Sequence, residues 1–414
     1  MTTASLTTPR REFEVIAVIG LVHGASHFFH LLLPPLFPWL MQEFGINFAQ
    51  AGALMSMFFI VSGTGQALAG FVVDRAGAFR VLCAGLLLFV AAALSLAAAN
   101  SYGALFLVAA LAGLGNSVFH PADFSLLNRR VSKVRLGHAF SMHGLSGNLG
   151  WAAAPPCLVA GAVWGGWRFA AAAAAAVAVA ALAVLVWRRH ALIDAIEAHE
   201  PADARAAAPT AGALAFLRVP VIWMCFGFFL LATSAVSGLQ NFGPTVLQKL
   251  YAVSLALGTT ALSAFLLAGA AGVFAGGFFV AGTERQDRVI ALALASAAAL
   301  GLVLASAQPP DWSITPLFAV MGFCNGFAMP SRDMLVRKAA TGKFGQAAYG
   351  RIYGFVYSGL DLGFAIAPLI FGYFLDGGHP SWVLAGAALA QFSALSCALG
   401  IGTREARHGG AGAR

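Results

Sequence analysis

Long apolar runs alternate with short charged clusters along the whole chain, and this pattern predicts helices that cross a membrane. A bilayer core is about 30 Å thick and takes ~20 mostly apolar residues per crossing. The runs and their breakers predict twelve spans, at residues 13–41, 48–73, 81–99, 103–127, 138–164, 167–187, 219–248, 252–281, 289–307, 312–336, 349–375 and 381–402.

The longest polar interruption lies between the sixth and seventh spans, at residues 188–218. Its acidic residues and two prolines are typical of a linker. We therefore expect an N-terminal six-helix bundle at 1–187, a cytoplasmic linker at 188–218, a C-terminal six-helix bundle at 219–402 and a cytoplasmic tail at 403–414.

The positions of Lys and Arg predict the orientation in the bilayer, because positive residues that flank spans stay on the cytoplasmic side. With both termini in the cytoplasm, all 24 Lys and Arg except Arg168 and Lys249 fall on cytoplasmic segments or their membrane ends. The sequence thus predicts a multi-pass protein of the inner membrane with both termini cytoplasmic.

The two halves of the chain repeat each other. The fourth span reads GLGNSVFHPADFSLLNRR and the tenth reads GFCNGFAMPSRDMLVRK. Alignment of the two spans pairs Gly113 with Gly322, Asn116 with Asn325, and Pro121 with Pro330. Two halves with the same topology, related by an axis along the membrane normal, occur in transporters that alternate access around a central site. We predict an all-α membrane protein with twelve transmembrane helices in two pseudosymmetric six-helix halves.

Composition supports this prediction and excludes other classes. Of the 414 residues 60% are hydrophobic and 10% are charged, whereas soluble domains carry about 25% charged residues. The net charge of +8 does not indicate nucleic-acid binding, because the cations flank the spans. The five cysteines lie inside apolar stretches without CxxC spacing, which predicts neither a disulfide framework nor a zinc site.

Three histidines share one face of the first span. His23, His27 and His30 are spaced i, i+4 and i+7, which places them within about 60° of each other around a helix. Three imidazoles facing lipid would be costly, so this face should point into protein or a wet cavity. Each ring is either a neutral hydrogen-bonded packing residue or part of a proton relay or solute contact.

The fourth span repeats this spacing with Asn116, His120 and Asp123. An acid inside a membrane span is a functional candidate by default. The corresponding face of the tenth span carries Asn325 and Arg332, so Asp123 and Arg332 occupy pseudosymmetric places with opposite charges. Whether they form an ion pair stays open. Arg332 either extends to the cytoplasmic surface beside Asp333 or lies deeper, where its guanidinium would suit a carboxylate or phosphonate.

Spans 5 and 11 add further polar candidates. His143 and Asn148 lie in the fifth span, and Asp361 replaces Asn148 in the eleventh, where it could be a second protonatable acid. The glycines of span 5 come at helical spacing, which permits close helix approach; they are Gly144, Gly147 and Gly150. Because the histidines of spans 1, 4 and 5 belong only to the first half, we expect proton handling mainly there.

A basic turn joins spans 2 and 3. It reads GFVVDRAGAFR and contains Gly70, Asp74, Arg75, Gly77 and Arg80. One interpretation is an ordinary basic loop. The other is an interdomain latch, in which Gly70 allows close packing and Asp74 caps a neighbouring helix or pairs with an arginine in one access state.

These motifs resemble a known family over essentially the whole chain. The turn at Gly70, Asp74, Arg75 and Gly77 resembles the cytoplasmic loop motif of the major facilitator superfamily, although the basic residue expected directly after Gly77 is delayed to Arg80. His23, the run at 113–121 and the Gly-Asn-x-Gly at 147–150 resemble its fosmidomycin-resistance branch of proton-driven exporters. The resemblance implies the twelve-helix fold and efflux of a small organic solute in exchange for protons.

The chain departs from that branch at three polar positions. His27 stands where the branch has an acid, His30 where it has Gln, and Ala122 where it has Glu, with Asp123 one place later. These positions are suited to contact solute or proton, so the resemblance implies the fold without specifying fosmidomycin as the solute.

We therefore expect a secondary active transporter, a monomer without cofactor or resident metal, that exports a small organic solute in exchange for protons by alternating access. Protonation and solute binding would involve His27, His120, Asp123, His143 and Asp361. No phosphate-binding GxxxxGK[ST] loop indicates ATP coupling, and we expect no enzymatic activity.

Three alternatives stay open. A proton-coupled uptake symporter would use Arg332 to anchor an organic anion. A membrane-embedded metalloenzyme is suggested by the HxxxHxxH spacing at 23–30, although the chain has no His-His pair there and these residues lie well inside a span. A sensor would bind a solute without transporting it.

Overall fold

The computed structural model describes residues 9–192, 215–280, 283, 285–344 and 349–411, and every regular element among them is a helix. In chain order they are α1 Pro9–His30, η1 Pro34–Leu36, α2 Phe37–Phe44, α3 Phe48–Ala76, α4 Ala78–Ala97, α5 Tyr102–Asn116, α6 Phe119–Arg130, α7 Lys133–Gly165, α8 Trp167–Trp187, α9 Arg189–Leu192, η3 Ala215–Arg218, α10 Pro220–Tyr251, α11 Leu255–Val280, α12 Gln286–Ala305, α13 Asp311–Phe344, α14 Tyr349–Asp376 and α15 Pro380–Ala411.

Each of the twelve predicted spans corresponds to helix in the structure. Among the described residues, 11 helical stretches are both long and apolar enough to cross a membrane. The predicted span at 138–164 falls in α7, which has 33 residues but is not one of these stretches. Polar residues such as His143 and Asn148 lower its mean hydropathy. Its length still allows a crossing, because the polar side chains can be sheltered inside the bundle.

Two predicted spans are broken rather than continuous. The first leaves the α-helix after His30, and Pro34 and Pro35 begin the short η1 turn before α2. The fourth is divided into α5 and α6 by a turn at Ser117 and Val118. Prolines lie at both breaks, and Pro121, for example, has no N–H to donate to the carbonyl of Ser117. At the other end of the chain, α15 continues to Ala411, beyond the predicted limit at 402.

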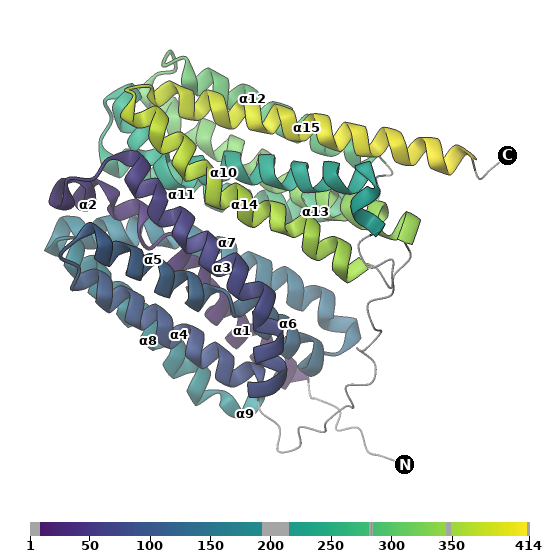
Figure 1. The fold of residues 1–414 in the computed structure, drawn as a ribbon, viewed down its shortest axis with the longest axis horizontal. Helices are drawn as coiled ribbons and strands as arrows, with labels where there is room; N and C mark the ends of the chain where they lie inside the picture. Colours follow the sequence, from purple (N-terminus) through teal and green to yellow (C-terminus); the bar gives the residue numbers. More distant parts are fainter. Residues whose placement is uncertain (1–8, 193–214, 281–282, 284, 345–348, 412–414) are drawn as a thin grey trace.

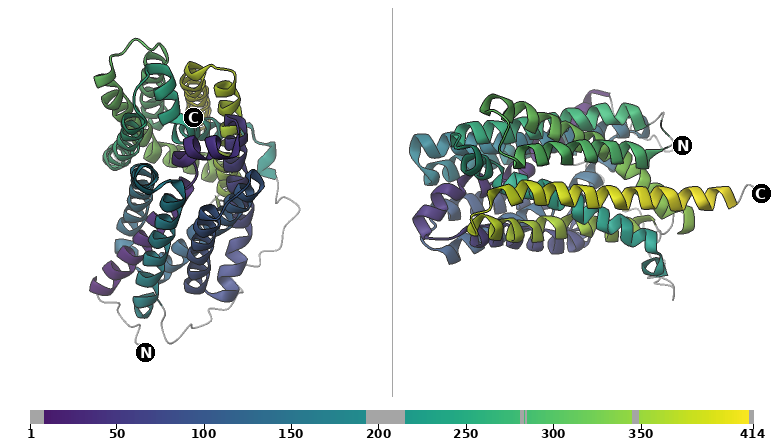
Figure 2. Two further views of the ribbon diagram at one scale, coloured as in Figure 1. Left: turned by 90° about the vertical axis from the view of Figure 1, so that its left-hand side faces the viewer. Right: turned by 90° about the horizontal axis from the view of Figure 1, so that it is seen from above.

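The helices lie in two groups, α1 to α9 and α10 to α15, as Figures 1 and 2 show. In the first group α1 packs on α7, α4 on α8 and α3 on α5; in the second, α11 packs on α13 and α10 on both α14 and α15. The groups touch mainly through α3 with α14 and α7 with α11. The predicted linker lies largely outside the described residues, so the domain boundaries remain a prediction.

The contact between α3 and α14 includes a carboxylate that caps a helix and a pair of stacked aromatic rings. At the start of α3, the N–H groups of Phe48 and Ala49 donate to the two carboxylate oxygens of Asp376 at 2.8 and 2.9 Å. Further along, the rings of Phe59 and Phe364 stack with centroids 4.5 Å apart. This seam joins the two groups near the end of the molecule where α3 begins and α14 ends (left in Figure 1).

Glycines allow α1 and α7 to pack closely, but the three predicted contact glycines of span 5 differ. A Cβ on Gly150 would strike the backbone of Gly24 in α1, and one on Gly147 would strike the rings of His27 and His23. A Cβ on Gly144 would meet nothing within 4 Å. Gly150 and Gly147 therefore hold α7 against α1, whereas Gly144 does not.

Candidate functional site

The histidines of α1 face the interior of the first helix group. His23, His27 and His30 are 2%, 8% and 7% exposed, which confirms the prediction that their shared face points into protein. The ring centroids of His23 and His27 lie 4.4 Å apart, and those of His27 and His30 lie 4.7 Å apart. Helical periodicity alone produces this ladder, and packing against α6 and α7 encloses it.

Asp123 on α6 is the buried acid of the cluster, with 0% exposure. Its Oδ2 atom accepts a hydrogen bond from Nε2 of His143 at 3.0 Å and lies 3.2 Å from Nδ1 of His23. The His23 contact meets the ion-pair distance but lacks hydrogen-bond alignment, because that Nδ1 has no hydrogen-bond partner. The rings of His23 and His143 stack at 3.5 Å. A carboxylate in the membrane interior is thus paired with imidazoles from two helices.

A second polar chain runs from α1 through α5 to α3. Nε2 of His30 lies 2.7 Å from Oδ1 of Asn116, and the Asn116 amide donates to Oγ of Ser62 at 2.7 Å. Because the amide oxygen can only accept, His30 donates through Nε2. Asn116, the last residue of α5, therefore lies beside the histidine ladder.

His120 and His27 complete the cluster from either side. Nδ1 of His120 lies 3.1 Å from Oε1 of Gln66 on α3. His27 packs against the indole of Trp151 with centroids 4.3 Å apart, and neither of its ring nitrogens has a hydrogen-bond partner. Because imidazole and carboxylate groups, which can each take up a proton, lie side by side here, this arrangement can hold and pass protons or bind a cation.

The structure separates four predicted site residues from this cluster. They are Asn148, Asn325, Arg332 and Asp361. Asn148 donates to the carbonyl of Gly144, and Asn325 accepts from Gln391 of α15 at 2.9 Å. Arg332 donates to Asp333 at 3.0 Å and lies over the ring of Phe229, so Asp123 pairs with histidines and not with Arg332. Asp361 on α14 faces Gly63 of α3 across the seam.

A family comparison now decides the class of protein. The family model described as "Major Facilitator Superfamily" matches residues 19–348. The chain belongs to this superfamily. It is a multi-pass membrane transporter, and its all-α architecture is the major facilitator fold.

Two curated relatives of this superfamily member match part of the chain. Over 152 residues it is 34% identical to the fosmidomycin resistance protein of Escherichia coli (strain K12), and over 160 residues it is 28% identical to the uncharacterized MFS-type transporter YfnC of Bacillus subtilis (strain 168). Each match covers 37% of this chain, and the chain spans 37% and 39% of those two proteins.

Solved structures of other transporters share the fold. A nucleoside transporter, NupG, in a mutant form, superposes with a TM-score of 0.73 at 15% identity, covering 94% of this chain and 98% of that one. A bacterial homolog of the human lysosomal transporter Spinster, in an inward-facing and unoccupied conformation, superposes with a TM-score of 0.70 at 12% identity over 96% of both chains.

The loop motif of the superfamily lies at the end of α3 and the start of α4. Gly70, Asp74, Arg75 and Arg80 are exposed and Gly77 is half-buried. Gly77 has φ +84°, a conformation that favours glycine, and a Cβ on Gly70 would meet nothing within 4 Å. The close packing expected of a latch at Gly70 is absent in this conformation, so the latch remains a prediction for another access state.

Sequence reasoning missed three members of the cluster in this transporter. Ser62 and Gln66 are spaced i, i+4 on α3 and bind Asn116 and His120, respectively. Two polar residues one turn apart in an apolar span were a detectable signal. Trp151 gave no such signal, because a tryptophan in a membrane helix is common near its ends and only packing places this one on His27.

Proposed function

We propose that this transporter exports a small organic solute in exchange for protons, by alternating access between the two helix groups. The observation that carries this proposal is the fully buried Asp123, held between His23 and His143. Ionisable residues inside membrane segments are costly and mark ion pathways or proton relays. A carboxylate whose oxygen lies beside imidazoles can exchange a proton with them, and hydrogen bonds from the imidazoles stabilise its ionised form.

The partial similarity to the fosmidomycin resistance protein supports export. His27 and His30 differ from the branch pattern and line the same cluster, so the solute of this chain need not be fosmidomycin. We infer a compact solute that carries polar groups, because the imidazole and amide side chains of the cluster can both donate and accept hydrogen bonds.

Alternating access would be carried by the α3–α14 and α7–α11 contacts between the groups. We propose an inner-membrane monomer with both termini cytoplasmic, in which these contacts open as the opposite ends close. Protonation of the Asp123 cluster would bias one state, since a ligand shifts an equilibrium only by its differential affinity for the two states.

The substitution Asp123→Asn tests this mechanism. Acid-inside inverted vesicles are prepared from cells that make the native chain, Asp123→Asn or Asp311→Asn, a control at an exposed carboxylate. Candidate toxic solutes, fosmidomycin included, are added while a fluorescent dye reports the proton gradient. A transported solute should dissipate the gradient with the native chain and the control but not with Asp123→Asn. Equal responses from all three chains would remove Asp123 from the mechanism.

The uptake alternative differs in the direction of coupled flux. In acid-inside inverted vesicles an antiporter accumulates solute as protons leave, whereas a symporter moves both out together. Arg332 would anchor the anion in the symporter, but it is engaged by Asp333 and Phe229. Accumulation of labelled solute therefore supports export, and its expulsion supports uptake.

A further inference from the structure

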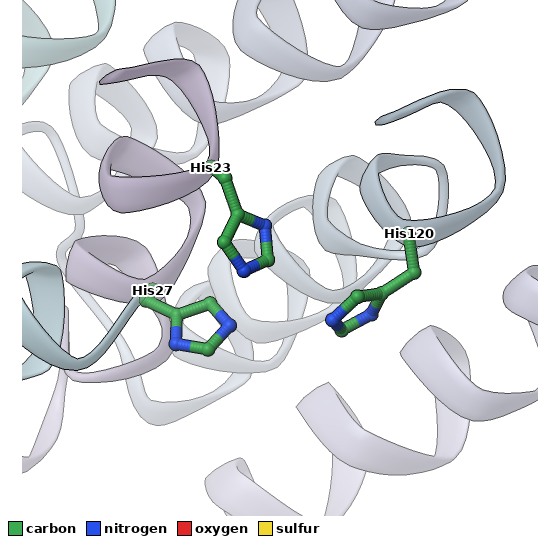
Figure 3. A group of neighbouring side chains, drawn as sticks. All are labelled: His23, His27 and His120. Carbon is green, nitrogen blue, oxygen red and sulfur yellow. The ribbon is translucent and has the colours of Figure 1, made fainter. Parts of the chain in front are cut away.

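Three imidazoles from two helices converge on one point inside the first helix group. His23 and His27 come from α1 and His120 from α6, and Figure 3 shows their rings facing one another. Each offers one ring nitrogen, and these nitrogens all lie within 4.8 Å of one another. Convergent nitrogens without a hydrogen atom between them repel electrostatically unless a cation or a proton lies among them.

The partner of His120 fixes which of its nitrogens carries the hydrogen. Nδ1 of His120 lies 3.1 Å from the side-chain amide oxygen of Gln66, and because this oxygen only accepts, Nδ1 carries the hydrogen. Nε2 of the neutral His120 ring then keeps its lone pair, which is the form that ligates a metal. Nδ1 of His23 lies 3.2 Å from Oδ2 of Asp123 without hydrogen-bond alignment, and a small rotation of this ring would let Nδ1 donate there and leave Nε2 for a metal.

His27 supplies an independent observation that points to a ligand. It is 8% exposed, yet neither Nδ1 nor Nε2 has a hydrogen-bond partner. Buried polar side-chain atoms in proteins nearly always have one. A cation bound among the three rings would give one nitrogen of His27 the partner that the protein does not.

We propose that His23, His27 and His120 bind a divalent transition-metal cation of the borderline class, such as Co²⁺, Ni²⁺ or Zn²⁺. Imidazole nitrogen suits these metals, whereas Mg²⁺ and Ca²⁺ take oxygen ligands. Tetrahedral coordination at 2.0–2.1 Å brings ligand nitrogens to about 3.4 Å apart, so ring rotation must draw these nitrogens inward. Three protein ligands leave at least one coordination position open.

Asp123 would support the site from behind His23. A metal-ligating histidine typically gives its other N–H to a carboxylate, which orients the ring and raises its basicity. Asp123 also holds His143, and this second group of His23, Asp123 and His143 could itself hold a cation. We assign the metal to the first group because Nε2 of His143 is already hydrogen-bonded to Asp123, whereas His27 is not hydrogen-bonded.

This site differs from the sequence expectation of no resident metal. The HxxxHxxH spacing suggested a membrane metalloenzyme, and the structure instead combines only the first two of those histidines with His120. His30 is engaged by Asn116. Metal binding by these three histidines depends neither on the solute that the protein carries nor on the direction of transport.

The experiment uses full-length protein purified in detergent through a tag without histidine and stripped with a chelator. Co²⁺ and Zn²⁺ are titrated by calorimetry with Mg²⁺ as the comparison ion, and Co²⁺ binding is also followed by its visible absorption. We expect one Co²⁺ per chain and no binding of Mg²⁺. Asp123→Asn should weaken Co²⁺ binding about 10- to 100-fold, and His27→Ala should weaken it further.

Matched variants keep the outcome interpretable. His138→Ala, an exposed histidine on α7, should leave the Co²⁺ affinity unchanged. His120→Gln serves as a second ligand variant if His27→Ala is not monodisperse. Absence of Co²⁺ binding, or equal affinity in native protein and folded ligand variants, would overturn the proposal. A loss in His143→Ala that exceeds the loss in His27→Ala would overturn the choice of ligands.

Discussion

Asp376 of α14 holds the start of α3 and thereby joins the two helix groups. Its two carboxylate oxygens accept the N–H groups of Phe48 and Ala49, while Asn47 accepts the next N–H, that of Gln50. The first N–H groups of a helix have no partner within the helix. Asp376 therefore caps a helix that belongs to the other group, and its loss should weaken the seam without unfolding α3.

We expect Asp376→Asn to favour opening of this seam by ~1–2 kcal/mol. An N-terminal cap contributes ~1 kcal/mol, and the charge at the positive end of the helix dipole adds ~0.3–1 kcal/mol at an exposed site. The asparagine retains one acceptor and removes the charge. A shift of this size changes the ratio of open to closed seams by about 5- to 30-fold.

The assay places a reporter in the seam. Oγ of Ser56 donates to the carbonyl of Ala365 across the interface and is buried, so Ser56→Cys should react with a maleimide only when α3 and α14 separate. The five native cysteines, one of them exposed at Cys157, are first replaced. Asp376→Asn should then raise the labelling rate about 5- to 30-fold.

Asn47→Ala is the matched control. It removes a cap from the same helix end, namely the acceptor for the N–H of Gln50, and the side-chain hydrogen bond that is lost lies within α3 and its cap. It should reduce thermal stability without raising the labelling rate at position 56. If both variants raised labelling equally, or Asp376→Asn had no effect, the idea that Asp376 joins the two groups would be wrong.

Further predictions concern the histidine cluster and its packing. A Cβ at Gly147 would lie 2.7 Å from Nδ1 of His27. Gly147→Ala should therefore destabilise the fold by ~1–3 kcal/mol through overpacking and weaken Co²⁺ binding about 5- to 150-fold. Gly144→Ala is the control: a Cβ there lies in open space and should leave the Co²⁺ affinity unchanged in the same titration. Gly150→Ala pushes against the backbone of α1 and should lower the thermal unfolding temperature in detergent, although Gly→Ala alone favours a helix by ~1 kcal/mol. Gln66→Leu removes a histidine's acceptor and should weaken Co²⁺ binding about 10- to 100-fold by calorimetry.

The membrane helices could be predicted from the sequence because bilayer thickness imposes a length and an apolar composition on each crossing. The residues at which two of these helices break could not be predicted in the same way. Pro34 and Pro121 interrupt spans 1 and 4 at points where a hydropathy pattern continues without change. A proline acts through one missing N–H and one steric clash. The mean hydropathy of a whole span does not reveal such a local effect.

Within the candidate site, the sequence determined that His23, His27 and His30 share a face, since helical periodicity depends on spacing alone. Tertiary packing decided the partners. Asp123 meets His143 and His23 because α6 and α7 both pack on α1. Arg332, whose pairing with Asp123 the pseudosymmetry left open, donates to Asp333 instead. Hydrogen bonds form over about 3 Å, and only the close approach of helices, permitted by residues such as Gly147, brings groups distant in the chain within that range.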